Sequence, residues 1–149
     1  MRAPSRDPRK LLEYAHPKLR HTAGAACMVV HLDCERQMAS YAGVGNISMF
    51  FGDREKVKWR SGDAGILGYR QIQVRQLRFT WEDGDILVLH TDGLRKEGVK
   101  RLIHHHHTPS DLANAIHAHQ YSGMDDALVL VCSLHAQRAV QIEEETIRA

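Results

Sequence analysis

Short apolar segments separated by polar turns run through most of the chain, which predicts β-strands joined by hairpins. Within residues 71–81 the alternation of apolar and polar positions changes phase at Arg75-Gln76, which indicates a β-bulge there. The predicted strands cover residues 25–32, 38–44, 47–51, 57–59, 71–81, 86–89 and 127–132.

Two further segments have helical signals instead. Asp7-Pro8 is typical of an N-cap followed by the first helical position, and this helix should end or kink near His16, before a proline. Thr108-Pro109 begins a second helix, with Gly123 as its expected C-cap. Together with the strands, these helices predict an α+β domain with a largely antiparallel sheet, arranged as two sheets face to face.

Acidic residues stand where two of the buried strands end or begin. Asp92 and Gly93 follow the strand at 86–89, and Asp125 and Asp126 directly precede the strand at 127–132. If these strands pair in antiparallel fashion, the carboxylates meet at one edge of the sheet. Carboxylate oxygens without thiolates suit a hard cation such as Mg²⁺ or Mn²⁺. Taken singly, each acidic site is better explained as a turn that accepts backbone hydrogen bonds, whereas the two together, in this order, favour the metal site.

Two glycine-rich segments allow more than one interpretation. The alternate glycines of residues 43–48 indicate either a tight corner between two sheets, which the composition favours, or a close approach to an active-site edge. Residues 61–68 contain three glycines, but they have neither the lysine nor the spacing of a phosphate-binding P-loop. We therefore expect an irregular connector or a flexible flap there, and no nucleotide cofactor.

Length and composition are those of a soluble globular protein. The 149 residues, 43% hydrophobic and 26% charged, predict a single domain over residues 1–149, with 1–6 and the polar tail 139–149 peripheral. A net charge of +2 gives no electrostatic reason to expect nucleic acid or a membrane as a partner. Without a signal segment, a membrane span or a cysteine framework, the expected location is cytoplasmic.

Four consecutive histidines, at residues 104–107, are a second candidate for metal binding. Adjacent side chains on a helix or loop point in different directions, so the run favours a polar helix end or loop over a specific zinc site. A histidine-rich protein that binds Zn²⁺ or Ni²⁺ is therefore the weakest of three functional hypotheses.

The order of the motifs resembles a known family. Thr91-Asp92-Gly93-Leu94 followed by residues 125–131 is similar to the aspartate motifs of the PPM-type metal-dependent serine/threonine phosphatases, in their SpoIIE-like (RsbX-like) bacterial branch. Residues 20–26, 43–48 and 65–68 also resemble that branch, and the similarity covers roughly residues 8–133. The fold that this resemblance implies is an αββα sandwich of mostly antiparallel sheets.

The resemblance also implies a site and an activity. Asp92 and Asp125 would be the catalytic metal ligands, with Gly93 and Asp126 beside them in a site for Mn²⁺ or Mg²⁺. The family holds two such ions, and a water that bridges them attacks the phosphorus directly, with no phosphoenzyme intermediate. The expected function is hydrolysis of phosphoserine or phosphothreonine on a regulatory protein, of the STAS type or from an anti-sigma partner-switching pathway.

One departure from the family pattern leaves an alternative open. The family has an earlier Asp-Gly motif whose aspartate bridges both metal ions, whereas the first Asp-Gly here is Asp83-Gly84, in a predicted turn. The sequence therefore predicts an N-terminally truncated sandwich, and Asp63 is a weak candidate to replace the missing aspartate. The second hypothesis is a non-catalytic interaction module that keeps the sheet and lacks a complete metal site.

Overall fold

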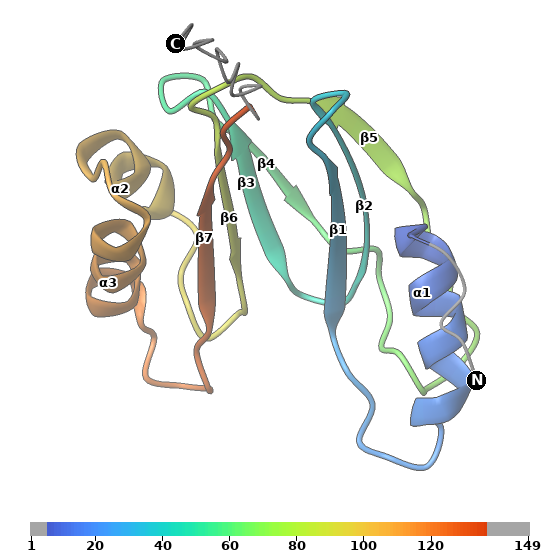
Figure 1. Ribbon diagram of the computed structural model, residues 1–149. Coiled ribbons are helices and arrows are strands. Elements are labelled where there is room, and N and C mark those ends of the chain that lie inside the picture. The colour runs from blue at the N-terminus through green and yellow to red at the C-terminus, as the bar shows by residue number, and fades with distance from the viewer. Residues whose placement is uncertain (1–5, 137–149) are drawn as a thin grey trace, which may run out of the picture.

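Four layers make up the fold in this computed structural model, which describes residues 6–136. Two antiparallel sheets face each other, with α1 on the outer side of one and α2 and α3 on the outer side of the other (Figure 1). The helices are α1 (Pro8–Ala15), the 3-10 helix η1 (His16–Leu19), α2 (Val99–His105) and α3 (Pro109–Gln120), and the strands are β1 (Cys27–Asp33), β2 (Met38–Val44), β3 (Ser48–Gly52), β4 (Lys58–Ser61), β5 (Leu77–Thr80), β6 (Ile86–His90) and β7 (Val129–Ser133). This order of layers confirms the αββα expectation.

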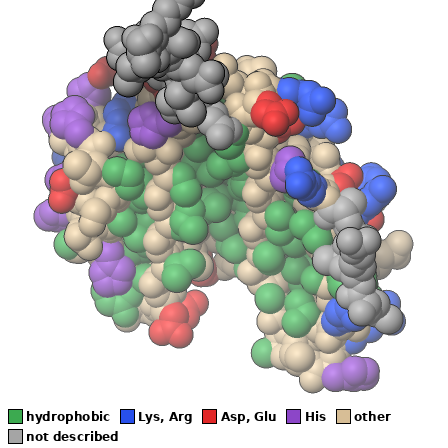
Figure 2. Space-filling view, viewed as in Figure 1, with side chains coloured by type: hydrophobic (Ala, Val, Ile, Leu, Met, Phe, Trp, Pro, Cys, Tyr) green, Lys and Arg blue, Asp and Glu red, His purple; other side chains and the backbone are tan. Residues whose placement is uncertain are grey.

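The two sheets have the strand orders β1-β2-β5 and β4-β3-β6-β7. Consecutive strands β2 and β3 belong to different sheets, so residues 45–47 form a corner between them. Strands β1 and β7 lie at sheet edges on the same side of the molecule (Figure 1). On that side, the space-filling view shows a hollow between the two sheets with hydrophobic side chains along it (Figure 2).

Alternation along the strands divides the apolar side chains among three clusters. In β3, Met49 and Phe51 pack between the sheets, whereas Phe50 packs outward against α2 and α3. On the other outer face, Leu12 of α1 packs on Val44 of β2. Full burial of one such side chain contributes about 1.5–3 kcal/mol, so the three clusters hold the layers in place.

Both predicted helix starts are confirmed. The Asp7 carboxylate accepts the backbone N–H of Lys10 at 3.0 Å, and the Thr108 hydroxyl accepts that of Asp111 at 3.1 Å. The predicted C-cap at Gly123 is wrong, because α3 ends at Gln120. The chain leaves the helix early since the next residue, Tyr121, forms a β-bridge with Leu94.

The predicted strand at 71–81 is correct only for its second half, β5. In place of a bulge at residues 75–76, the backbone N–H of Arg75 donates to the Asp63 carboxylate at 2.8 Å. Asp63 itself bonds through its backbone to Gly43 and Gly45, at the end of β2. Asp63 therefore occupies the position beside the end of β2, and residues 71–76 do not pair with that strand. The expectations for 139–149, and for 1–6 apart from residue 6, lie outside the described residues.

Helix α2 was not predicted as a helix, although its last turn falls on the expected polar helix end at His104 and His105. None of the helices in the described part of the chain is long and apolar enough to cross a membrane.

Candidate functional site

The pairing of β6 with β7 brings the predicted acids to one end of their sheet. The strands are antiparallel, with Ile86 opposite Ser133 and His90 opposite Val129, which confirms the pairing that the sequence left conditional. Asp92, which follows β6, therefore lies at the same end of the sheet as Asp125 and Asp126, which precede β7. Figure 1 shows the loops before β7 and after β6 at the same end, and Figure 2 shows acidic side chains there.

Thr91 continues the contact between the two strands beyond their ends. Its backbone N–H donates to the Leu128 carbonyl at 3.1 Å, and its hydroxyl accepts the Leu128 N–H at 2.9 Å. The same hydroxyl lies 3.4 Å from the Asp126 carbonyl, to which it donates. Three hydrogen bonds thus fix the backbone next to Asp92 relative to the backbone next to Asp126.

Gly93 makes the approach between the two acidic segments possible. A Cβ at this position would collide with the Asp126 carbonyl oxygen and would lie 3.0 Å from that of Asp125. The Gly93 carbonyl accepts the N–H of Ser122 at 2.9 Å, which ties the same loop to the end of α3. Any side chain at residue 93 would therefore push the loops apart.

Asn46 joins the site from the corner between the sheets, and sequence reasoning did not single it out. Its side-chain amide donates to the Asp92 carboxylate. The glycines of the 43–48 motif were the available signal. Their tight-corner interpretation is correct, and the corner also reaches the acidic site. The corner is rigid because the Gly45 N–H donates to the Asp63 carbonyl and the Asp63 N–H to the Gly43 carbonyl, both at 2.8 Å.

His90 is a buried residue at the end of β6 that holds the backbone next to Asp92. It is 2% exposed and stacks on Phe50, with ring centroids 5.9 Å apart. Its Nδ1 lies 2.8 Å from the Thr91 carbonyl, the geometry of a donated hydrogen bond. Burial lowers the pKa of His90, which keeps the ring neutral at neutral pH. A neutral donor at this position fixes the Thr91 backbone without placing a cation beside Asp92.

The donors at this end of the sheet are of the kind that hard cations prefer. Asp92, Asp125 and Asp126 are exposed, and one carboxylate oxygen of Asp125 accepts the Asp126 N–H at 2.8 Å. Among the described residues, no three His, Cys, Asp or Glu side chains form a group that could hold a metal ion. Magnesium commonly binds through one or two carboxylates plus water and substrate phosphate, so the residues present fit such an ion without forming a complete protein cage.

Asp63 does not join this group of acids. Its carboxylate accepts the backbone N–H and the Nε of Arg75, both at 2.8 Å, and pairs with a terminal guanidinium nitrogen at 2.6 Å. These contacts hold Asp63 at the end of β2, facing Arg75.

The histidine run is held by other contacts. His104 lies 3.0 Å from a Glu55 carboxylate oxygen. The Arg54 guanidinium donates to the backbone carbonyls of Ile103, His106 and His107 at 2.6 to 3.0 Å. The run therefore forms the end of α2 and the turn after it, as the sequence favoured.

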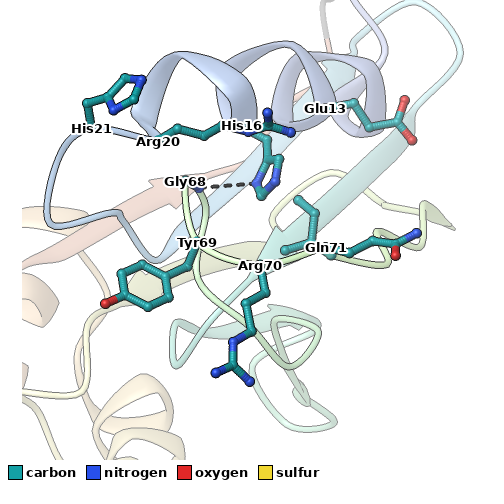
Figure 3. A pocket seen from close by; sticks show the side chains of 9 residues that line it. Glu13, His16, Arg20, His21, Gly68, Tyr69, Arg70 and Gln71 are labelled. Carbon is teal, nitrogen blue, oxygen red and sulfur yellow. Dashed lines mark hydrogen bonds between the residues drawn. The ribbon is translucent and has the colours of Figure 1, made fainter.

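A cavity of about 780 Å³ lies elsewhere, between the α1–η1 segment and residues 68–72. Figure 3 shows His16 pointing to Gly68, whose N–H donates to its Nδ1 at 3.1 Å, and Arg70 pointing away from the helix. No acid of the predicted site lines this cavity.

Two sheets packed between helical layers, with acids at the shared end of two paired antiparallel strands, are features of the PPM-type metal-dependent phosphatases. The family model described as stage II sporulation protein E (SpoIIE) matches residues 3–135. The chain belongs to this family, in its SpoIIE-like branch. A comparison with curated protein sequences gives no match.

Solved structures give the same fold. RsbX in complex with magnesium is 18% identical with a TM-score of 0.75, over 84% of this chain and 63% of that one. A chain from a structure of the bacterial stressosome is 25% identical with a TM-score of 0.73, over 83% and 66%. The manganese-soaked phosphatase domain of SpoIIE from Bacillus subtilis is 19% identical with a TM-score of 0.66, over 91% and 77%. This chain thus spans less than two thirds of the RsbX and stressosome chains.

Proposed function

We propose that the chain is a metal-dependent protein phosphatase that hydrolyses phosphoserine or phosphothreonine on a regulatory protein. The observation that carries the proposal is the antiparallel register of β6 and β7, which places Asp92 and the Asp125-Asp126 pair at one end of the sheet. Membership of the SpoIIE family supports the same assignment.

In this proposal Asp92 and Asp125 are the catalytic metal ligands, and Asp126 and the Gly93 carbonyl contribute beside them. Mg²⁺ or Mn²⁺ bound there supplies a nucleophilic water near neutral pH and neutralises charge on the phosphoryl group. Asn46 orients the Asp92 carboxylate by its hydrogen bond. Thr91 sets the distance between the acidic segments, because it bonds to the backbone of both Leu128 and Asp126.

The proposed substrate is a phosphorylated partner-switching regulator of the STAS type or from an anti-sigma pathway, and the proposed location is the cytoplasm. The likeness to RsbX and to a stressosome chain supports this class of partner. The three acids are exposed at the end of the sheet, so a phosphorylated residue on the surface of a folded protein could reach them.

Hydrolysis of a phosphoserine peptide, measured with Mn²⁺ and after chelation, tests the proposal. We expect activity that requires the metal and that Asp92→Asn lowers by at least about 100-fold, the scale on which loss of transition-state stabilisation acts. Asp53→Asn is the matched control, because Asp53 is an exposed turn residue at the opposite end of β3 whose carboxylate accepts the Glu55 N–H. Hydrolysis that persists in EDTA, or a wild-type rate in Asp92→Asn, would contradict the proposal.

A second candidate is a non-catalytic interaction module. The observation that favours it is that the described residues bring no three potential ligands together in one metal-holding group. Such a module would bind the regulator equally well with Mn²⁺ and with EDTA, and it would show no hydrolysis. Loss of partner binding in EDTA would rule it out.

A further inference from the structure

A second cavity, of about 610 Å³, opens beside the acidic site. Asn46, which donates to the Asp92 carboxylate, stands on its wall, so the cavity and the acids are immediate neighbours. The cavity is also lined by Ser48, Ser61, Trp59 and Lys96. Asp63 lies in the lining as well, and its carboxylate is paired with the Arg75 guanidinium.

Lys96 is held over the face of Trp59. Its Nζ lies 4.1 Å from the ring centroid, a cation–π contact worth about 0.5–1 kcal/mol at an exposed site. The indole is itself fixed, because its N–H donates to the Ser48 hydroxyl at 3.2 Å. Within residues 6–136 no carboxylate forms an ion pair with Lys96. The ammonium group is therefore not engaged by a carboxylate of the described residues, and its contact with Trp59 favours one position of the side chain.

Glycine backbone forms another part of the lining. A Cβ at Gly62 would lie 2.5 Å from the Gly45 carbonyl oxygen, so residue 62 must have no side chain. The backbone bonds of Asp63 to Gly43 and Gly45 keep this part of the lining in place. At the rim, Ile66 is 46% exposed and Trp59 is 38% exposed. The cavity thus combines the Lys96 ammonium group and two serine hydroxyls with an apolar rim.

We propose that this cavity receives the phosphorylated segment of the substrate protein, and that Lys96, braced by Trp59, is a specificity residue that pairs with the phosphoryl oxygens. The inference rests on the proposed phosphatase function and names the part of the chain that recognises the substrate. A phosphate dianion matches an unpaired ammonium next to hydroxyl donors. The apolar rim fits a residue that flanks the phosphorylated serine or threonine.

Steady-state kinetics on a phosphoserine peptide give the first test. We expect Lys96→Gln to raise KM about tenfold or more while kcat stays within about twofold, because the contact forms already in the bound substrate. Lys96→Arg should restore most of the affinity. Lys100→Gln is the matched control, since Lys100 is an exposed lysine on α2 outside the cavity lining. An unchanged KM in Lys96→Gln, with the wild type active, overturns the inference and leaves the proposed function standing.

Intrinsic fluorescence gives a second test that does not need catalysis. Of the two tryptophans, Trp81 is 3% exposed, so Trp59 is the reporter for the cavity. Inorganic phosphate should change the emission saturably in the wild type and in Lys100→Gln, and only weakly in Lys96→Gln. This result would support the Lys96 site even if the chain hydrolysed nothing. No phosphate-dependent change in the wild type would overturn it.

Discussion

Thr91 and Leu128 exchange two hydrogen bonds beyond the ends of β6 and β7: the Thr91 N–H donates to the Leu128 carbonyl at 3.1 Å, and the Leu128 N–H donates to the Thr91 hydroxyl at 2.9 Å. Neither residue belongs to a strand. The pair therefore extends the register of the sheet into the loops, where Asp92 and Asp126 stand. The geometry of the acidic site depends on a threonine hydroxyl as well as on the strands.

Replacing that hydroxyl tests its role. Thr91→Val keeps the shape of the side chain but leaves the Leu128 N–H without its protein acceptor; because Leu128 is exposed, we expect a loss of about 0.5–1.5 kcal/mol, the net contribution of one hydrogen bond. We expect Mn²⁺ affinity to fall about tenfold by calorimetry, with the fold retained in circular dichroism. Thr91→Ser keeps the hydroxyl and should bind nearly as the wild type does. Equal affinities in Val and Ser variants would show that the hydroxyl does not position the acids.

Gly93 should tolerate no side chain. Because a Cβ there meets the backbone of residues 125 and 126, Gly93→Ala must separate the two loops. We expect the free energy of unfolding in urea to fall by about 1–3 kcal/mol, as for other overpacked sites, and Mn²⁺ affinity to fall with it. Wild-type values for both quantities would mean that the loops are not as close as the structure places them.

Arg54 should stabilise the end of α2. Its guanidinium donates to the carbonyls of Ile103, His106 and His107, which the helix itself leaves without partners. We expect Arg54→Met to lower the free energy of unfolding by about 2 kcal/mol, since hydrogen bonds from a charged group are the stronger kind. Arg101→Met, on the exposed side of the same helix, is the control. If the two variants have equal stability, the three hydrogen bonds contribute nothing measurable.

The three cysteines should differ in reactivity. Cys34 is exposed in the turn after β1, whereas burial raises the pKa of the Cys27 and Cys132 thiols and lowers their thiolate fraction. We expect one thiol to react rapidly with an aromatic disulfide reagent at pH 8, and Cys34→Ser to remove that fast phase. Fast reaction of a thiol in Cys34→Ser would contradict the placement of Cys27 and Cys132.

Local signals predicted the parts of this fold that depend on neighbouring residues. The caps at Asp7 and Thr108 bond to N–H groups three residues away, so the sequence holds both partners in one short window. The αββα layers and the placement of Asp92 and Asp125 at the same end of the sheet followed from strand patterning and from the family resemblance. The layers and this placement are confirmed as structure, whereas the metal-binding role of these acids stays a prediction.

Local sequence signals could not predict contacts between segments that are distant along the chain. Asn46 reaches Asp92 across 46 positions because of how the corner between the sheets is placed, which periodicity does not record. The strand predicted at 71–76 failed because the Asp63 carboxylate, twelve positions away from Arg75, takes that residue's N–H. Helix α2 begins at Val99, and its N-cap residue Gly98 has no side chain to cap it, so the sequence gave no start signal.

Calorimetric titration of the chain with Mn²⁺ tests the central claim most directly, with Asp92→Asn as the variant and Asp53→Asn as the control. The account predicts saturable binding in the wild type and in Asp53→Asn, and its loss in Asp92→Asn. Absence of binding in the wild type, or equal binding in Asp92→Asn, would contradict a metal site at the shared end of β6 and β7.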